Sequence, residues 1–595
     1  MNSIPHLIHR LWQHFSKKRK MQFYYVLVLM LIASFSEVLS LGAVLPFLAA
    51  LADPNYVYTH KYVQPLVQAL HLTSANQIIF PMVIIFMAAV LFSGCIRVLL
   101  LYVMTRFSYA IGADLSFDVY NRTLHQKYEV HISRNSSEII NGIINKTDAV
   151  IGGIISPILL LISSSVLFIS ILIALFSINV FASLVSSIGF GMLYWFITIK
   201  SRKRLRANSH SIAVESTIVI QSLQEGLGGI RDVLIGGSQK FYCDKFRASD
   251  LKLRHAQGNN SFITGSPRFI IEALGMILIA GLAYFLYLKD GSLTEAMPIL
   301  GALALGAQRM LPALQQGYGS ISTMRGHKES FEDVLTLLEQ SLPSKTEAFN
   351  CAPILFDKKI SLKAVSFRYS IMTPWVLKDI DLEINKGSSV GFIGRTGDGK
   401  STLVDLIMGL LLPSKGSIFI DDALVGIDNI RSWQKHISHV PQSVFLSDGT
   451  IAENIAFGIE EENIDYLRVE KAAQQAQISG FIEGMDQKYQ TKVGERGVQL
   501  SGGQCQRIGI ARALYKEADV IIFDEATSAL DNQTETEVIK TINGLKTNLT
   551  IIMIAHRLST LKHCDKIIDL SKGKVSFVGR YDETNPKLHD KDKTC

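Results

Sequence analysis

The sequence has few charged residues and no closely paired cysteines. The first argues against a chain that is wholly soluble, and the second against a fold held by disulfides or zinc. Only 19% of the 595 residues are charged, whereas 48% are hydrophobic, so we expect part of the chain to lie in lipid. The net charge of +7 sits largely beside apolar runs, at residues 17–20 and 200–206, and so does not indicate a nucleic-acid partner. The six cysteines show no paired spacing, which predicts neither a disulfide framework nor a zinc site: Cys95, Cys243, Cys351, Cys505, Cys564 and Cys595.

Long apolar runs predict six membrane-spanning helices in the first half of the chain. A bilayer is crossed by roughly 20 apolar residues, so the uncharged stretch 149–199 is long enough for two spans, with a turn near residues 177–179. The other four spans are predicted at residues 21–52, 77–105, 269–288 and 296–316.

The distribution of basic residues predicts the orientation of these spans. Lysine and arginine are frequent before the first span and at the start of segment 200–268, and rare in segments 53–76 and 289–295. Because cytoplasmic segments carry the excess of basic residues, both termini are expected in the cytoplasm.

Segments 106–148 and 200–268 combine charged and apolar residues at helical spacing. We expect long helices that project about 30 Å from the membrane, with breaks near residues 131–137 and 226–229. The ends of these helices, at the two breaks, are then placed to contact a soluble domain. Plain amphipathic surface helices are the alternative reading.

Five charged residues fall within or at the edge of the predicted spans, where charge is costly: Glu37, Arg97, Arg268, Glu272 and Arg309. One interpretation is structural, with Glu37 and Arg97 neutralising each other. The other is a cavity in which arginines bind an anionic group such as phosphate. Spacing alone leaves both open.

The second half contains a glycine-rich loop between a predicted strand, 389–393, and a predicted helix, 403–408. In this context backbone N–H groups and a helix N-terminus surround a phosphate group. We expect Lys400 to reach the terminal phosphates and Ser401 to offer its hydroxyl to Mg²⁺. The predicted nucleotide-binding residues of the loop are Gly394, Arg395, Thr396, Gly397, Asp398, Gly399, Lys400, Ser401 and Thr402.

A second apolar run, residues 520–523, has the pattern of a buried parallel strand and ends in Asp524 and Glu525. An acid at this position is placed to hold Mg²⁺ through water, and the next one to polarise the attacking water. We therefore predict Asp524 as a metal residue and Glu525 as a catalytic one.

With further motifs in order, this half resembles the ATPase domain of ABC transporters. Residues 500–504, LSGGQ, match the family signature, 528–531 the D-loop, and 493–497 a segment that meets the membrane helices. The resemblance implies ATP and Mg²⁺ as cofactors, and composite sites in a homodimer because the signature belongs to the opposite ATPase domain. It implies roles in catalysis for Gln442 and His556, in Mg²⁺ sensing for Gln442, in adenine stacking for Tyr369, and in nucleotide binding for Ser501, Gly502, Gly503, Gln504 and Asp531.

These observations predict an α-helical membrane domain with six spans followed by an α/β P-loop ATPase of ABC type. We place the membrane domain at residues 1–337, a linker at 338–352, the ATPase at 353–585 and a polar tail at 586–595. Membrane half first and ATPase second resembles the exporter class, in which ATP hydrolysis drives transport.

Within exporters, the membrane half is similar to the lipid-linked oligosaccharide flippases of bacterial glycosylation, the PglK type. The similar stretches are 34–37 with 44–47, 267–272 and 309–312, and segment 53–76 resembles that family's external helix. The resemblance implies a bacterial cytoplasmic membrane and pyrophosphate contacts from Arg97, Arg268 and Arg309. Two alternatives stay open: an exporter of another amphipath, such as lipid A, a drug or a peptide, and an ATP-gated channel that transports nothing.

Overall fold

The structure, a computed structural model, divides the chain into two compact units. It describes residues 3–52, 54–178, 180–290, 293–342, 354–494, 497–525, 538, 549–554, 561–562 and 564–581. The first unit comprises Met1–Gln126 and Arg134–Leu342, and the second comprises Lys127–Ser133 and Pro343–Cys595. The predicted boundaries of the linker at 338–352 and of the tail at 586–595 remain predictions, because most of the linker and all of the tail lie outside the described residues.

The first unit is built of helices. The long ones are α2 (Lys17–Ala52), α5 (Ile79–Leu124), α9 (Ser156–Ile178), α10 (Val180–Gly228), α12 (Gln239–Gly265), α13 (Pro267–Asp290) and α14 (Leu293–Gly326). Shorter helical segments are α1 (Ile4–His14), α3 (Pro54–Thr59), α4 (Gln64–Ala69), η1 (Ala75–Ile78), α7 (Ser136–Asn141), η2 (Gly142–Lys146), α8 (Thr147–Val150), η3 (Ile151–Ile155), α11 (Ile230–Ile235) and α15 (Lys328–Leu338).

Helices occupy all six positions predicted for membrane spans, namely α2, α5, α9, α10, α13 and α14. The predicted third and fourth spans fall on two helices, α9 and α10, and the turn predicted at residues 177–179 includes Asn179, which lies outside the described residues. Within the part of the chain that the structure describes, three helical stretches are long and apolar enough to cross a membrane: Lys17–Leu51, Ala75–Leu124 and Ser136–Ala174. The segment predicted as one external helix forms two short ones, α3 and α4.

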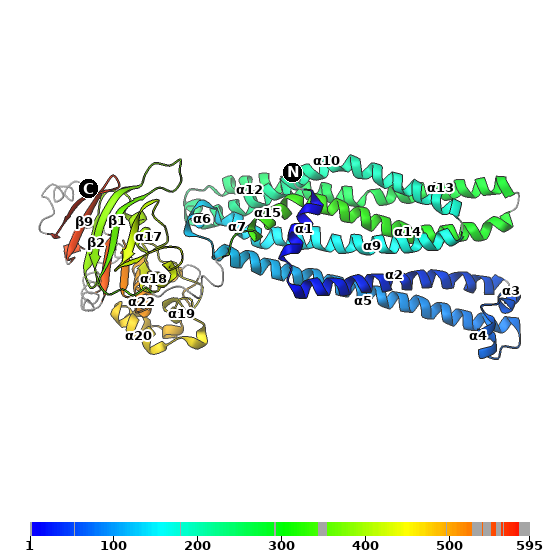
Figure 1. Cartoon of the computed structure of the whole chain (residues 1–595), viewed down its shortest axis with the longest axis horizontal. Helices are drawn as coiled ribbons and strands as arrows, with labels where there is room; N and C mark the ends of the chain where they lie inside the picture. Colours follow the sequence, from blue (N-terminus) through cyan, green and yellow to red (C-terminus); the bar gives the residue numbers. More distant parts are fainter. Residues whose placement is uncertain are drawn as a thin grey trace. The chain divides into compact units, whose positions relative to one another are not determined.

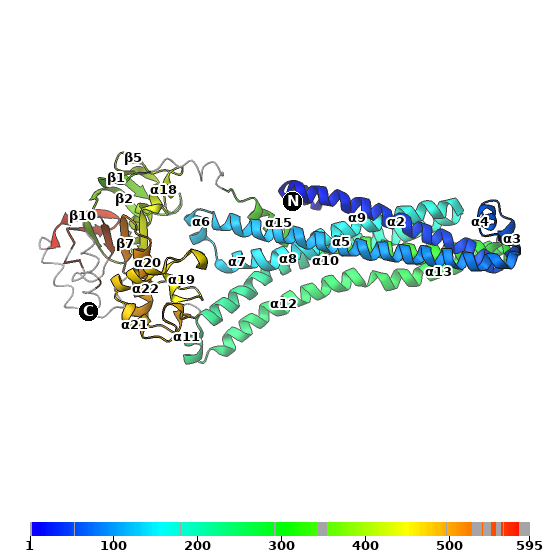
Figure 2. The same cartoon turned by 90° about the horizontal axis from the view of Figure 1, so that it is seen from below.

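The long helices pack as antiparallel neighbours. Helix α2 packs along α5, α9 along α14, and α10 along α12, as Figures 1 and 2 show. An apolar core joins α1, α2, α5, α9 and α15 and includes Leu7, Ile111, Ile154 and Phe331, all at most 1% exposed. This core lies toward the end of the bundle where α5 and α10 extend past the predicted spans.

Long helices with short helices at their ends occupy the two segments predicted as extensions. Helix α10 runs without a break from the predicted fourth span to Gly228, and α11 turns the chain into α12 (Figure 2). After α5, the short helix α6 (Tyr128–Ser133) groups with the second unit.

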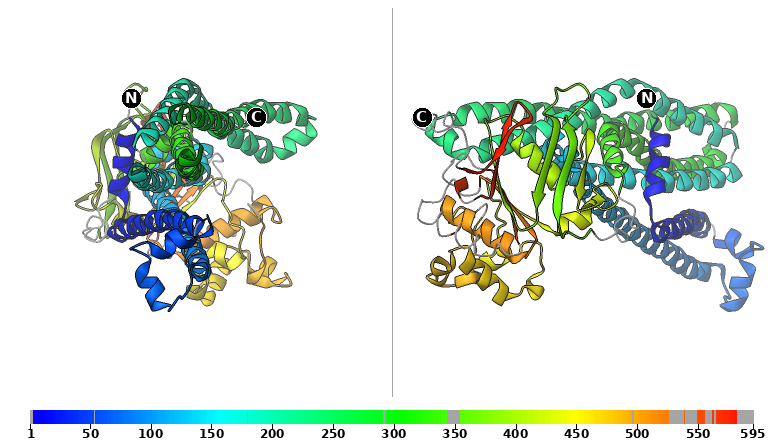
Figure 3. Two further views of the ribbon diagram at one scale, coloured as in Figure 1. Left: turned by 90° about the vertical axis from the view of Figure 1, so that its right-hand side faces the viewer. Right: turned by 60° about the vertical axis from the view of Figure 1, so that its left-hand side comes forward.

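The second unit contains two sheets. The first has the order β2-β1-β4-β5 and is antiparallel; the right-hand view of Figure 3 shows its long green strands side by side. The second has the order β10-β9-β3-β8-β7-β6, in which β9, β3, β8, β7 and β6 run parallel. The strands are β1 (Lys359–Phe367), β2 (Leu377–Asn385), β3 (Ser389–Ile393), β4 (Lys415–Ile420), β5 (Ala423–Leu424), β6 (Ile437–Val440), β7 (Val520–Asp524), β8 (Thr550–Ile554), β9 (Lys566–Ser571) and β10 (Lys574–Gly579).

Helices and apolar cores cover both faces of the parallel strands, which are buried as their continuous apolar sequence predicts. One core includes Trp433 and Phe392 and lies between the two sheets, and the other includes Ile508 and Ile551. The helical segments are α17 (Lys400–Ile407), α18 (Ile430–Lys435), α19 (Ile451–Ile455), η4 (Glu461–Asn463), α20 (Tyr466–Gln475), α21 (Ser479–Glu483), η5 (Lys488–Gln490) and α22 (Gly502–Tyr515).

Candidate ATP site and intramembrane charges

The glycine-rich loop lies between the carboxyl end of β3 and the N-terminus of α17, as predicted. Its glycines have left-handed backbone conformations, with φ of 145° at Gly394 and 94° at Gly399. A Cβ at Gly394 would lie 2.3 Å from the carbonyl oxygen of Leu570, a backbone atom that cannot move aside. Only glycine therefore fits there, and the loop keeps its backbone N–H groups free of side chains.

The amine of Lys400 lies across the loop. Its Nζ donates to the carbonyl oxygens of Gly394, at 2.8 Å, and of Arg395, at 3.0 Å. The side chain is buried and sits in the first turn of α17. A cation held over a ring of backbone N–H groups, at a helix N-terminus, is suited to a phosphate group.

Asp398 has a structural role that its sequence position does not reveal. Its Oδ2 accepts from the backbone N–H of Arg395, at 2.8 Å. Its Oδ1 accepts from the backbone N–H of Lys572 in the turn between β9 and β10, at 3.0 Å. The carboxylate therefore fixes the loop to the neighbouring strand pair. This acceptor pattern could not be read from the motif, because Lys572 is remote in sequence.

Tyr369 lies beside the loop, as the resemblance implies. Its hydroxyl lies 3.1 Å from Oγ1 of Thr402, and its ring packs edge-on against Phe367 at 5.0 Å between centroids. The side chain is about half exposed, at 48%. One end of the tyrosine is thus anchored while a face of the ring is open to a planar ligand.

The structure brings two predicted catalytic residues together. Gln442, just after β6, donates from Nε2 to Oε2 of Glu525 at 2.7 Å. Glu525 directly follows β7 and has a left-handed backbone, with φ of 52°, held by its N–H bond to the carbonyl of Ile554 at 3.0 Å. An amide that binds the carboxylate from one side orients it for contact with water.

Asp405 is a further acidic residue near the site that the sequence motifs do not include. It lies on α17, one turn after Ser401. Burial raises its pKa to about 6, and the neighbouring Asp524 adds to the shift. The effect of Asp524 shows that the carboxyl end of β7 faces the first turns of α17, where Ser401 also lies.

The signature begins a second well-formed helix N-terminus. Ser501 caps α22: its Oγ accepts from the N–H of Gln504 at 3.3 Å, and Oε1 of Gln504 accepts from the N–H of Ser501 at 2.7 Å. This reciprocal capping fixes the turn. The N–H groups of Gly502 and Gly503, in the first turn, are thereby directed outward to an anion.

Two predicted site residues, Asp531 and His556, lie outside the described residues, so their roles stay predictions. The same is true of the side chain of Arg309, although its backbone belongs to α14.

The other two intramembrane arginines have acidic neighbours. Nε of Arg97 lies 3.4 Å from Oε2 of Glu37, which also accepts from Oγ of Ser93 at 2.8 Å. Glu37 is only 2% exposed, so the pairing matches the structural interpretation of these charges. Nε of Arg268 lies 3.9 Å from Oε2 of Glu272 on the same helix, and both side chains are at least half exposed.

Together, the fused helical membrane unit and the ATPase unit define an ABC exporter that couples ATP hydrolysis to transport. Sequence models of two families match the chain: "ABC transporter transmembrane region" over residues 23–294 and "ABC transporter" over residues 377–528. The ABC domain binds ATP. One membrane domain and one ATPase domain make a half-transporter, which implies a dimer.

Curated relatives place the chain more closely. A protein of Alkalilimnicola ehrlichii is 31% identical over 66% of this chain and 67% of its own length, and one of Cupriavidus pinatubonensis is 28% identical over 81% of each. Both are called ATP-dependent lipid A-core flippase. A bacterial Atm1-family ABC exporter with ATP bound has the same fold, with a TM-score of 0.77 over 96% of each chain at 22% identity. The chain belongs to the ABC transporter family and is a multi-pass membrane protein.

Proposed function

We propose that the chain hydrolyses ATP with Glu525 and Gln442 in composite sites of a homodimer. The contact of 2.7 Å between these side chains carries the proposal, because it holds a carboxylate ready to orient water. His556 and Asp531 complete the site by resemblance, with Ser501, Gly502, Gly503 and Gln504 coming from the second copy.

The donor set fits Mg²⁺, which prefers oxygen ligands and binds few protein groups besides substrate phosphates. The hydroxyl of Ser401, the carboxylate of Asp524 and the amide oxygen of Gln442 would hold it. When bound, the ion neutralises charge that develops on the phosphates.

The substrate we propose is an amphipathic glycolipid of the lipid A-core kind, moved across the bacterial cytoplasmic membrane with both termini of the chain in the cytoplasm. The support is the similarity to lipid A-core flippases, which extends over both the membrane and ATPase halves. ATP binding favours closure of the paired ATPase domains, and the long helices α5 and α10 transmit this bias to the membrane.

A pyrophosphate-linked oligosaccharide is the second candidate, supported by the resemblance of residues 34–47, 267–272 and 309–312. The half-exposed guanidinium of Arg268, only loosely paired at 3.9 Å, is the observation in its favour. The pairing of Arg97 with the buried Glu37 reduces the support for Arg97 as a pyrophosphate contact.

Transport assays in proteoliposomes distinguish the two substrates. Fluorescent lipid A-core and a fluorescent pyrophosphate-linked glycolipid are offered separately, and ATP-dependent loss of outward-accessible label is measured. We expect flipping of lipid A-core, no flipping by Glu525→Gln, and an ATPase rate at least 100-fold lower in that variant with ATP binding retained. The matched control Glu461→Gln, an exposed residue of η4, keeps both activities.

Selective flipping of the pyrophosphate-linked lipid, abolished by Arg268→Ala, would establish the second candidate instead. ATP hydrolysis without transport of either lipid would refute both substrates while leaving the ATPase assignment in place.

A further inference from the structure

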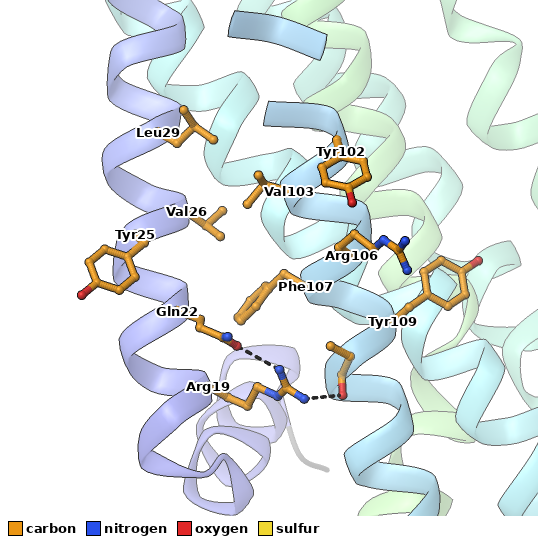
Figure 4. A pocket seen from close by; sticks show the side chains of 11 residues that line it. Arg19, Gln22, Tyr25, Val26, Leu29, Tyr102, Val103, Arg106, Phe107 and Tyr109 are labelled. Atoms are coloured by element: carbon orange, nitrogen blue, oxygen red, sulfur yellow. Dashed lines mark hydrogen bonds between the residues drawn. The ribbon is translucent and has the colours of Figure 1, made fainter. Parts of the chain in front are cut away.

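A pocket of about 770 Å³ lies between α2 and α5, outside the ATP site. Its lining is mostly apolar and aromatic, with Arg19 at one end and Arg106 near the middle of the α5 side. The lining residues are Arg19, Gln22, Tyr25, Val26, Leu29, Tyr102, Val103, Arg106, Phe107, Tyr109 and Ala110 (Figure 4).

The two arginines differ in how far their charge is balanced. Nε of Arg19 donates to Oδ2 of Asp114 at 2.8 Å, and its other nitrogens donate to Oε1 of Gln22 at 2.9 Å and the carbonyl of Ala110 at 3.3 Å. Arg106, by contrast, has no ion pair with a carboxylate in the described part of the chain. Its guanidinium lies 5.6 Å from the centre of the Tyr102 ring.

The dimensions of the pocket match one membrane leaflet. From Arg19 to Leu29 the helix α2 rises about 15 Å, which is half of the hydrocarbon thickness of about 30 Å. The arginines lie where the apolar runs of α2 and α5 end, and by the proposed orientation this is the cytoplasmic boundary. The apolar lining, including the buried Val26, extends from there toward the bilayer centre.

We propose that this pocket binds an anionic glycerophospholipid of the cytoplasmic leaflet as a bound, untransported lipid. The head-group phosphate pairs with Arg106, Tyr109 lies at the level of the head group, and an acyl chain packs along Val26, Leu29 and Val103. A pocket of this volume suits a ligand of drug-like size, such as a head group with part of one chain. The proposal goes beyond the transport reaction and depends only on the membrane orientation.

Retention of lipids through purification tests the proposal. The full-length protein is reconstituted in nanodiscs with equal amounts of phosphatidylglycerol and phosphatidylcholine, released into detergent, and the lipids that remain bound are counted by native mass spectrometry. We expect wild-type protein to retain phosphatidylglycerol about fivefold over phosphatidylcholine, the factor typical of one basic residue at an anionic surface.

Arg106→Gln should bring this ratio close to one, whereas Arg204→Gln should leave it unchanged. Arg204 is the matched control because it is an exposed arginine just beyond the predicted fourth span and does not line the pocket. Val103→Trp fills the groove without changing charge, so it should lower the number of retained lipids and provides the test if Arg106→Gln does not fold.

Three results would overturn the proposal. Equal retention of the two lipids by wild type removes the charge preference. Retention that neither Arg106→Gln nor Val103→Trp changes indicates that something else, such as a second copy of the chain, fills the groove. Displacement of phosphatidylglycerol by added lipid A-core would make the pocket an entry site for the transported lipid. The first two results would leave the proposed transport function untouched, because the flipping assays test that function separately.

Discussion

At the scale of single residues, three carboxylates of the ATP site have different roles because they meet different neighbours. Asp398 accepts two backbone N–H groups and fixes the loop. Glu525 accepts from the side-chain amide of Gln442. Asp405 is partly buried, and this burial together with the nearby Asp524 raises its pKa to about 6. Residue type alone therefore does not separate a structural carboxylate from the one that we propose as catalytic, whereas their hydrogen-bond partners differ.

Asp398→Ala should weaken ATP binding about tenfold, because two backbone donors lose a charged acceptor and the loop loses its connection to the turn at Lys572. The dissociation constant is measured with a fluorescent ATP analogue on the purified transporter. Asp428→Ala, which removes an exposed carboxylate elsewhere in the same domain, should bind as wild type does. Unchanged or tighter binding by Asp398→Ala would mean that the lost negative charge matters more than loop order.

At the scale of helices, the third predicted span is approached through irregular turns. The segments η2 and η3 are π-helical and flank α8. In η3, Gly153 packs against the ring of His327, between α14 and α15. Such irregular turns mark places where a helix is fitted to its neighbours rather than to its own ideal geometry.

Gly153→Ala should therefore destabilise the membrane unit. The new Cβ would lie 2.5 Å from Cγ and 2.7 Å from Cβ of His327, and a different rotamer cannot move the Cβ aside. Overpacking of this kind costs about 1–3 kcal/mol, so we expect thermal denaturation of the detergent-solubilised protein to shift down by roughly 2–10 °C.

The adjacent Gly152→Ala is the matched control. Its Cβ would meet nothing within 4 Å, and alanine favours a helix over glycine by about 1 kcal/mol. Its melting temperature should equal or exceed that of wild type. Equal losses in both variants would show that the glycine backbone, rather than contact with His327, matters here.

The sequence predicts elements better than it predicts contacts between remote residues. Apolar runs located the six helices at the predicted span positions, and the phosphate-loop and strand motifs located β3, α17 and β7 correctly, because these signals are local. The bond from Asp398 to Lys572 and the π-helical turns could not be predicted, since each depends on tertiary neighbours. The pairing of Glu37 with Arg97 was one of two open interpretations, because spacing gives no side-chain geometry.

At the scale of the whole molecule, the two helix N-termini of the ATPase domain need different partners. The loop before α17 carries Lys400 and a complete phosphate cradle, whereas the signature at α22 offers only the N–H groups of one capped turn. In the family arrangement, each ATP is bound by the loop of one copy and the signature of the other. The alternative is that each copy hydrolyses ATP in cis, with its own loop and signature.

Heterodimers with two substitutions separate these arrangements. Lys400→Ala disables the loop, and Ser501→Arg disables the signature. When the substitutions lie on opposite copies, composite assembly leaves one site with a native loop and a native signature, whereas assembly in cis leaves none. When both lie on one copy and the other is wild type, composite assembly leaves no native site, whereas assembly in cis leaves one.

The two heterodimers, isolated with a different affinity tag on each copy, carry the same substitutions and differ only in their distribution. If composite sites act independently, the first should hydrolyse ATP at about half the wild-type rate and the second at close to none. The reverse pattern would show that each ATPase domain acts alone. Steady-state ATPase rates at saturating ATP distinguish composite assembly from assembly in cis. Both heterodimers carry the same two substitutions, so activity lost through misfolding should be similar in the two.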